Sequence, residues 1–596
     1  MESKTLLSAI TQLWRTLSRR RRAQFYVLLL VMIAASFAEI FSLGMIVPFL
    51  LVLTAPDHVQ DHQVVRAIMH LLGVTQPKDL VLWLALAFCL ATIIAAGVRV
   101  FLLYVSTGFS FALGADLSLD IYRRTLYQPY RVHLGRNSSE VISGVIGKTN
   151  AMINNVIGQL LTIASSTILL IGILAALLAI NAQITIIAVV AFALIYGSVF
   201  AWTRRRLARD SEVVSRESTR TIRAIQEGLG GIRDVLIDGT QETFTGIYQT
   251  SDRMTRAAQG RMALTAGSPR FVVEGLGMMF IALLAAFSTG QGQTQVIPML
   301  GALALGAQRL LPVVQQMYAA VVTIRSSEAS LWDVLELLRQ PLPTISTRSD
   351  VPMPFRHEIR LRDVSFAYAP DGQQVLRRLS LSIKKGSRIG IFGPTGGGKS
   401  TLLDILMGLL PPTEGSVLVD DVEVDPENLA SWRAHVAHVP QSIFLADAPI
   451  AENIAFGRPA AAIDISRVRE AATMAQIADV IVKLPAQYGA MVGERGIRLS
   501  GGQRQRLGVA RALYKQADFI VLDEATSALD DETERELMAA IDSLSQDLTI
   551  VMVAHRLSTL RNCDLVIEVA DGEIRQSGTY DDLIGKRGLG VVDRVG

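Results

Sequence analysis

The chain has 596 residues, of which 50% are hydrophobic and only 19% are charged, a balance too apolar for an ordinary soluble protein. Its 57 basic and 54 acidic residues leave a net charge of +3, which is too small for this length to indicate a nucleic-acid partner. Cys89 and Cys563 lie far apart in the sequence and indicate neither a disulfide framework nor a metal site.

Six apolar segments in the first half of the chain are long enough to cross a membrane, for which about 20 residues are needed. They lie at 25–53, 79–108, 156–180, 182–203, 270–289 and 294–322. A cleaved signal peptide is the alternative for the first segment, but its apolar run is longer than such a peptide usually has. The segments therefore predict a polytopic α-helical membrane domain with six transmembrane helices.

Basic clusters indicate how these segments are oriented. The clusters SRRRRAQ (18–24), IYRRTLYQPYR (121–131) and WTRRRLARD (202–210) all fall on one side of the predicted spans. The opposite turns, 179–183 and 289–295, contain no Lys or Arg. By the positive-inside rule the basic side, with the N-terminus, is cytoplasmic.

Two connections between spans carry further signals. Residues 61–73, between the first two spans, have apolar residues at helical spacing and predict a short amphipathic helix on the outer membrane surface. The alternative is that this apolar stripe only packs on neighbouring spans. The cytoplasmic connections are long and charged, and we expect helices there to extend beyond the bilayer.

The composition changes after the sixth span. Residues 339–355 contain four prolines and no periodicity, as in a linker. Short apolar strands are then predicted at 387–393, 518–524 and 548–555, and the DG pair within 565–578 predicts a hairpin turn. The predicted order is a cytoplasmic segment (1–24), a transmembrane domain (25–335), a linker (336–355) and a cytosolic α/β ATPase domain (356–596).

The sequence GPTGGGKS fits the P-loop pattern and lies between a predicted strand and a helix. In such a loop the glycines let backbone N–H groups wrap phosphates, Lys399 reaches the β/γ oxygens and Ser400 binds Mg²⁺. The predicted nucleotide-binding residues are Gly393, Pro394, Thr395, Gly396, Gly397, Gly398, Lys399, Ser400 and Thr401.

Two carboxylates end a predicted buried strand. Asp523 is placed to hold Mg²⁺, and the adjacent Glu524 to accept the proton of an attacking water. The alternative is an acidic pair that only stabilises a helix N-terminus. The P-loop and the LSGGQ stretch (499–503) in the same chain favour the catalytic interpretation.

The stretches LSGGQRQRLGVARAL (499–513) and FIVLDEATSALD (519–530) resemble the ATP-binding cassette family, and the resemblance extends over 356–585. It implies ATP and Mg²⁺ as cofactors and an ATP hydrolase coupled to transport. The resemblance also implies roles for individual residues. Tyr368 would stack on adenine, and Gln441 would form the Q-loop and bind Mg²⁺. The signature would be Ser500, Gly501, Gly502 and Gln503, Asp530 would belong to the D-loop, and His555 would be the switch histidine. The alternative for His555 is a structural histidine at the end of a strand, with its hydrogen bonds satisfied and no catalytic role.

The chain carries one P-loop and one signature. In this family each ATP lies between the P-loop of one cassette and the signature of another, so the resemblance implies a half-transporter that works as a homodimer. Six spans ahead of the cassette, and the loop VGERG (492–496), match the exporter arrangement. We expect the cytoplasmic segments Tyr127–Gly135 and Gly230–Asp234 to dock on the cassettes near Gln441.

The membrane half has a resemblance of its own, carried by residues 39–50, 127–142, 228–244 and 268–277. These stretches look like the bacterial flippases of lipid-linked oligosaccharides (PglK type). That resemblance implies flipping of an anionic glycolipid from the inner to the outer leaflet of the bacterial cytoplasmic (inner) membrane. An exporter of another lipid, a drug or a peptide, and an ATP-gated channel or regulatory membrane protein, remain alternatives.

Three arginines lie within predicted spans at similar depth: Arg99, Arg270 and Arg309. A charge inside a membrane is costly unless it reaches the interface or meets an anion. Guanidinium groups bind phosphate bidentately, so the three are candidates for the pyrophosphate of a polyprenyl-linked sugar. The alternatives are that Arg99 and Arg270 extend to the interface, or that Arg270 pairs with Glu274 four residues later.

Overall fold

The architecture comes from a computed structural model, which describes residues 5–45, 77–180, 182–288, 293–342, 353–369, 372–525, 531–542, 547–554 and 556–585. The chain forms two compact units. The helical unit comprises residues 1–128 and 136–342, and the cassette unit comprises residues 129–135 and 343–596. The predicted amphipathic helix at 61–73 lies outside the described residues.

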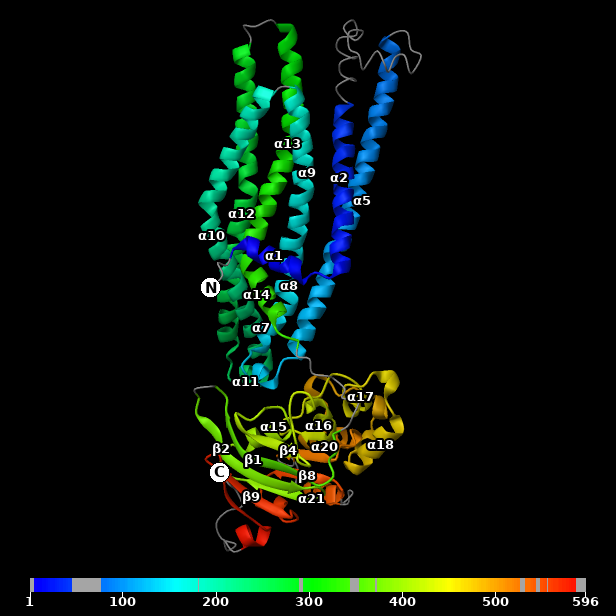
Figure 1. The fold of residues 1–596 in the computed structure, drawn as a ribbon, viewed down its shortest axis with the longest axis vertical. Coiled ribbons are helices and arrows are strands. Elements are labelled where there is room, and N and C mark those ends of the chain that lie inside the picture. Colours follow the sequence, from blue (N-terminus) through cyan, green and yellow to red (C-terminus); the bar gives the residue numbers. More distant parts are fainter. Residues whose placement is uncertain are drawn as a thin grey trace. The chain divides into compact units, whose positions relative to one another are not determined.

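Long helices dominate the helical unit (Figure 1). They are α2 (Arg19–Gly44), α5 (Pro77–Leu126), α9 (Gly158–Ile180), α10 (Ala182–Gly230), α12 (Gln241–Ser288) and α13 (Gln293–Ser326). α5 has 50 residues, so at ~1.5 Å per residue it is far longer than the ~30 Å hydrocarbon core of a bilayer. The predicted helical extensions are therefore confirmed.

The outer faces of these helices are apolar. Leu30, Phe37, Tyr104, Leu194 and Phe271 are all more than half exposed. Large apolar side chains on a helix surface are expected where lipid tails cover them. Within the described residues, three segments meet a combined length and hydropathy test for crossing a membrane: Arg19–Ser42, Val81–Leu126 and Ser138–Ala175.

Short helices complete this unit. They are α1 (Leu6–Thr16), α7 (Ser138–Ile142), α8 (Thr149–Met152), α11 (Ile232–Ile237), α14 (Glu328–Arg339) and two π-helical segments, η2 (Ser143–Lys148) and η3 (Ile153–Ile157). Residues 336–339, which we assigned to the linker, form the last turn of α14, because Leu335 and Leu338 pack into the helical core. Residues 19–24, assigned to an N-terminal segment, are the first turns of α2.

The cassette unit contains two sheets. The antiparallel sheet has the order β2-β1-β4-β5, formed by β1 (Glu358–Ala367), β2 (Gln374–Lys384), β4 (Glu414–Val419) and β5 (Val422–Glu423). The larger sheet has the order β10-β9-β3-β8-β7-β6. Its strands are β3 (Arg388–Phe392), β6 (Val436–Val439), β7 (Phe519–Asp523), β8 (Thr549–Val553), β9 (Leu565–Ala570) and β10 (Glu573–Gly578).

The predicted strands are confirmed as β3, β7 and β8, which run parallel to one another. The predicted hairpin is confirmed as β9–β10, with Asp571 and Gly572 at positive φ in its turn. Because β3, β6, β7 and β8 are parallel, the residues that follow them meet at one sheet edge.

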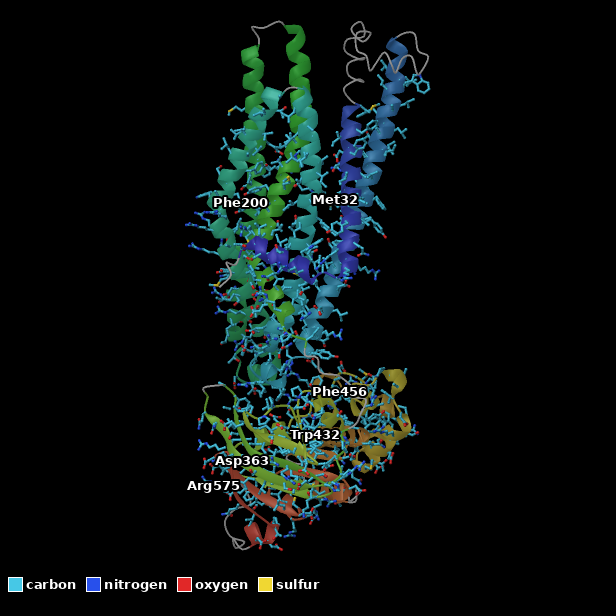
Figure 2. All side chains as sticks on the ribbon, in the orientation of Figure 1. Met32, Phe200, Asp363, Trp432, Phe456 and Arg575 are labelled. Atoms are coloured by element: carbon cyan, nitrogen blue, oxygen red, sulfur yellow. The ribbon has the colours of Figure 1, made fainter. Side chains whose placement is uncertain are left out.

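Helices complete the cassette unit. They are α15 (Lys399–Leu406), α16 (Leu429–His435), α17 (Ile450–Ile454), α18 (Ile465–Met474), α19 (Ala478–Val482), α20 (Gly501–Tyr514) and α21 (Asp531–Asp542). Trp432 is fully buried in the core beside Phe519, and its indole N–H donates to the Leu406 carbonyl at 2.9 Å. Figure 2 shows Trp432 inside the cassette unit. This core holds β3 and α15 fixed on either side of the P-loop.

Candidate functional site

The P-loop links β3 to α15 in a conformation that only glycine adopts easily. Gly396 has φ +80° and Gly398 has φ +101°, both in the left-handed region. A Cβ on Gly393 would overlap the Val569 carbonyl oxygen, although one on Gly396 would meet nothing within 4 Å. Close approach, together with a φ of +147°, therefore requires glycine at 393, whereas backbone conformation alone requires it at 396.

Lys399 begins α15 and its side chain folds back over the loop. Its Nζ donates to the carbonyl oxygens of Gly393 at 2.7 Å and Pro394 at 2.9 Å. Burial lowers the pKa of this ammonium, while the nearby carboxylates of Glu524 and Asp523 oppose that shift. The loop thus presents a cation and successive backbone N–H groups, which is a binding site for phosphates.

Three side chains at the same sheet edge carry the predicted chemistry. Gln441 follows β6, Asp523 ends β7 and Glu524 comes directly after it. The side-chain amide of Gln441 donates to the Glu524 carboxylate. Glu524 has φ +50°, and its backbone N–H donates to the Val553 carbonyl at 3.1 Å. A left-handed backbone at a non-glycine residue costs about 1–2 kcal/mol and is typical of functional positions.

Tyr368 follows β1 and its side chain is 43% exposed. Its ring packs edge-on against Phe366, with centroids 4.9 Å apart, and its hydroxyl lies 3.0 Å from Thr401 Oγ1. An exposed aromatic ring tied to the P-loop helix can stack on a nucleotide base.

The segment Pro129–Gly135 belongs to the cassette unit and also contacts Tyr368. Arg131 donates to the Tyr368 carbonyl oxygen from Nη2 at 2.6 Å and from Nε at 3.1 Å. Burial, with the charges of Asp404 and Tyr368, raises the pKa of Tyr130. The sequence predicted that this segment contacts the cassette near Gln441. It did not predict the contact of Arg131 with Tyr368, because these residues lie 237 positions apart.

Asp404, on α15, is a second residue that the sequence gave no reason to select. Burial raises the pKa of its carboxyl to about 6, and the neighbouring charge of Asp523 adds to the effect. A carboxylate on an amphipathic helix is usually solvated, so only the folded structure shows its burial.

The signature residues begin α20. Ser500 Oγ accepts from the Gln503 backbone N–H at 3.2 Å, and the Ser500 N–H donates to Gln503 Oε1 at 2.9 Å, which forms a capping box. Gly501 and Gly502 form the first turn, at the positive end of the helix dipole. Among the described hydrogen bonds and ion pairs, none joins Ser500–Gln503 to the P-loop.

Two of the predicted site residues, Asp530 and His555, lie outside the described residues. Within the described part of the chain, no group of three or more His, Cys, Asp or Glu side chains is arranged to hold a metal. The residues predicted to hold Mg²⁺ are Ser400, Gln441 and Asp523, and their hydroxyl, amide and carboxylate oxygens suit that ion.

Two of the membrane arginines lie beside carboxylates. Arg99 Nη1 is 3.2 Å from Glu39 Oε1, and Arg270 Nε is 2.8 Å from Glu274 Oε1. The second pair was one of the predicted alternatives, whereas Glu39 lies on a different helix and was not considered. Arg309 lies in α13, and its side chain is outside the described part of the structure.

Both halves of the chain are similar to known ABC transporters. Residues 376–527 match the family described as ABC transporter, and residues 25–298 match the ABC transporter transmembrane region. The chain is similar to the ATP-dependent lipid A-core flippase of Chromohalobacter salexigens, with 31% identity over 478 residues, or 79% of this chain and 81% of that protein. It is 29% identical over 477 residues, or 80% of each chain, to the protein of the same name from Ralstonia nicotianae.

A solved structure has a similar fold throughout. It is the structure of a bacterial Atm1-family ABC exporter with ATP bound, which aligns with a TM-score of 0.76 and 26% identity. The alignment covers 96% of this chain and 97% of the other.

Proposed function

This chain belongs to the ATP-binding cassette transporters and is an ATP-driven exporter, and on that premise we propose that it flips a lipid with a large sugar headgroup. It joins a type I exporter transmembrane domain to an α/β ATPase domain. The observation that carries the cargo proposal is similarity over about four-fifths of the chain to proteins named for flipping a glycolipid. The direction would be from the inner to the outer leaflet of the bacterial cytoplasmic membrane.

Two glycolipid classes compete as the cargo. Residues 39–50, 127–142, 228–244 and 268–277 resemble flippases of lipid-linked oligosaccharides, whereas the relatives above are named for lipid A-core. Both classes present sugars next to phosphate groups. We take the lipid-linked oligosaccharide as the first candidate and the lipid A-core glycolipid as the second.

Hydrolysis would use the residues at the P-loop edge. Lys399 would hold the β/γ-phosphates, and Ser400, Gln441 and Asp523 would hold Mg²⁺, which neutralises phosphate charge when bound. Glu524 would accept the proton of the attacking water, a role supported by its hydrogen bond with Gln441. Tyr368 would stack on adenine. Asp530 and His555 keep the roles that the family resemblance gives them.

Two copies of the chain would be needed for turnover. The sequence has one P-loop and one signature, and the described contacts do not join them within the chain. We therefore propose a homodimer in which Ser500–Gln503 of each copy complete the nucleotide site of the other. The helix dipole and free N–H groups at the start of α20 suit a phosphate there.

Coupling would run through the two cytoplasmic segments. Pro129–Gly135 already packs within the cassette unit. The second segment, Gly230–Asp234, leads into α11, which exposes the apolar side chains of Leu236 (60%) and Ile237 (81%) just beyond it. We propose that Gly230–Asp234, with α11, docks on a cassette near Gln441. Cysteine pairs placed between α11 and the cassette, in a chain lacking Cys89 and Cys563, should crosslink in at least one nucleotide state. Absence of crosslinks in every state would contradict this contact.

Flipping in proteoliposomes tests the cargo. The probes are labelled polyprenyl-pyrophosphate oligosaccharide, lipid A-core glycolipid and a phospholipid, each with and without ATP. Wild type should flip a glycolipid faster than the phospholipid, and the Glu524→Gln variant should flip none. Equal rates for all lipids would contradict a sugar-headed cargo. Ion conductance without lipid movement would favour the channel instead.

A further inference from the structure

The first two helices of the helical unit meet at a group of arginines. α1 lies across the long helices, and the chain then turns into α2 (Figure 1). Arg15 lies in the last turn of α1, and Arg19 and Arg22 lie at the start of α2. Arg22 Nη2 donates to the backbone carbonyl of Arg15 at 3.0 Å and so ties the two helix ends together. Three arginines from two helices therefore share one corner of the unit.

These arginines have no counter-ion among the described residues. Arg15 and Arg19 are exposed, and within the part of the chain that the structure describes neither side chain makes a hydrogen bond or an ion pair. Arg22 Nε is buried and has no hydrogen-bond partner there. The neighbouring Arg21, in contrast, is paired with Asp116 at 2.7 Å. The corner therefore offers positive charge and an unsatisfied N–H donor to an external anion.

Aromatic rings lie beside the Arg22 side chain. Its guanidinium carbon is 5.9 Å from the centroid of the Trp14 ring. The Trp14 ring packs edge-on against Phe25, with centroids 5.1 Å apart, and against Tyr26 at 6.3 Å. Trp and Tyr gather at the headgroup level of a membrane, because each ring is apolar and carries one polar group. These rings therefore indicate that the arginine corner lies between the headgroups and the acyl chains.

The face of α2 that carries Arg19 and Arg22 continues as an apolar stripe. Four large side chains follow on that face at spacings of three and four residues: Tyr26, Leu30, Ile33 and Phe37. They are between 48% and 70% exposed. The opposite face of the helix packs into the helical core, where Leu28 and Met32 are each 1% exposed. The arginines and the stripe therefore lie on the side of α2 that points away from the core.

The stripe has the length of one membrane leaflet. At ~1.5 Å per residue, the distance along the helix from Tyr26 to Phe37 is about 17 Å. Half of the ~30 Å hydrocarbon core of a bilayer is about 15 Å. A lipid whose acyl chain covers this stripe would place its headgroup at Arg19 and Arg22. By the positive-inside rule these arginines are cytoplasmic, so the lipid would belong to the cytoplasmic leaflet.

We propose that Arg15, Arg19 and Arg22 bind the phosphate of an anionic phospholipid of the cytoplasmic leaflet, whose acyl chains lie along the stripe of α2. Guanidinium groups bind phosphate oxygens bidentately, and basic residues at this depth attract anionic lipids. The bound lipid would neutralise the corner and hold α1 against α2. It is not the transported lipid, so this inference does not depend on the identity of the cargo.

Quenching of Trp14 fluorescence by brominated lipids tests the site. The full chain is placed in phosphatidylcholine nanodiscs that contain increasing fractions of brominated phosphatidylglycerol or of brominated phosphatidylcholine with the same acyl chains. The chain has five tryptophans, so the Trp14 signal is taken as the difference between wild type and Trp14→Phe. Phosphatidylglycerol should quench this signal at a mole fraction about tenfold lower than phosphatidylcholine does.

Two variants with equal loss of charge locate the effect. Arg15→Gln/Arg19→Gln removes two exposed side chains that have no partner among the described residues, so the fold should be unchanged. Its preference for phosphatidylglycerol at Trp14 should fall about threefold or more. Arg204→Gln/Arg205→Gln is the matched control, because it removes two exposed arginines from another cytoplasmic basic cluster. The control should keep the preference of wild type.

Four results would overturn the assignment. Equal quenching of Trp14 by the two lipids would mean that ordinary annular lipid covers the stripe. A preference that survives in Arg15→Gln/Arg19→Gln would exclude these arginines as the site. Equal loss of preference in both double variants would mean that net charge, and not this corner, attracts the lipid. Quenching by neither lipid would mean that another surface, such as a second copy of the chain, covers the stripe.

Discussion

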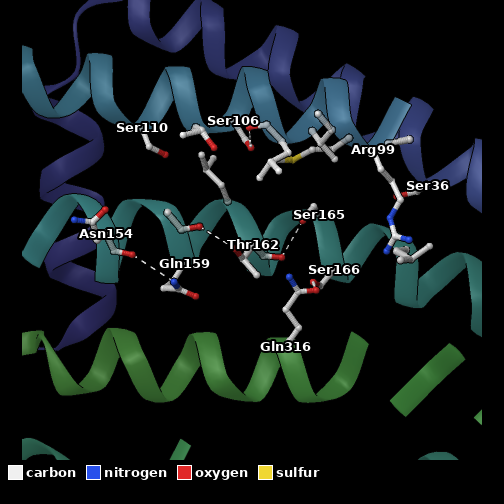
Figure 3. Close-up of a pocket in the computed structure, with 18 of the residues that line it drawn as sticks. Ser36, Arg99, Ser106, Ser110, Asn154, Gln159, Thr162, Ser165, Ser166 and Gln316 are labelled. Carbon is white, nitrogen blue, oxygen red and sulfur yellow. Dashed lines mark hydrogen bonds between the residues drawn. The ribbon is translucent and has the colours of Figure 1, made fainter. Parts of the chain in front are cut away.

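The nucleotide-binding loop and the cavity of the helical unit are built from different parts of the polypeptide. The P-loop presents backbone N–H groups from residues close together in the sequence, after Pro394, and its glycines are required by conformation and by close approach. The cavity, of about 370 Å³, is lined by side chains from Ser36 to Gln316, which α2, α5, η3, α9 and α13 carry (Figure 3). A backbone site tolerates few sequences and is therefore visible as a motif, whereas a side-chain site becomes visible only after the helices pack.

The largest expected effect lies at the nucleotide site. Replacing Glu524 by Gln should lower ATP turnover by 10²-fold or more, because a positioned general base is typically worth 10²–10⁴. Steady-state phosphate release from the purified protein measures it. Glu452→Gln, at an exposed position on α17, is the control and should hydrolyse ATP normally. Turnover retained in Glu524→Gln would remove this residue from the catalytic role.

Glycine substitutions compare the two regions directly. Gly393→Ala should weaken ATP binding by roughly 10-fold or more, since overpacking against the Val569 carbonyl costs about 1–3 kcal/mol. Gly396→Ala should weaken it less, because its Cβ has space and only the left-handed backbone is unfavourable. Gly97→Ala, in the membrane helix α5, meets nothing within 4 Å and should be neutral.

Titration with a fluorescent ATP analogue gives all three affinities. Equal losses at 393 and 396 would show that conformation, and not close approach, controls the loop.

The same contrast explains what the sequence could predict. The strands β3, β7 and β8, the P-loop and the Asp523–Glu524 pair follow from local patterns, because each is specified within a few residues. The Arg270–Glu274 pair was also foreseeable, since residues four apart share a helix face. In contrast, Arg99 meets Glu39 and Arg131 meets Tyr368 only through tertiary packing. No pattern in one sequence reports such distant pairs.

Arg131 allows the two regions to be tested together. It lies in the chain between α5 and α7 of the helical unit, and it donates hydrogen bonds to the Tyr368 carbonyl in the cassette unit. Arg131→Ala removes two hydrogen bonds to the Tyr368 carbonyl and should weaken ATP binding about threefold to tenfold. Arg131→Lys keeps a donor and should recover part of the loss. The same fluorescent titration measures both variants. An alanine variant that binds ATP like wild type would show that this contact does not position Tyr368.

The smallest expected effect concerns Asp404, whose pKa rises from an ordinary value near 3.8 to about 6 in the folded cassette. The folded state therefore binds a proton more readily than the unfolded chain. Its stabilising contribution is present below pH ~4 and is lost as the pH rises through 6. Asp404→Asn removes the buried charge, so it should stabilise the nucleotide-free protein at pH 8 by on the order of 1 kcal/mol, since one pKa unit corresponds to 1.36 kcal/mol and the carboxyl is only half-buried.

Thermal unfolding of the full chain at several pH values measures this difference. Asp447→Asn is the control, because Asp447 is exposed whereas Asp404 is half-buried. The gain in midpoint from Asp404→Asn should shrink as the pH falls from 8 through 6, since the wild-type carboxyl then becomes neutral. A gain that is equal at pH 8 and pH 4.5 would mean that the amide stabilises by packing. A loss at pH 8 would mean that the Asp404 charge has a partner that burial does not reveal.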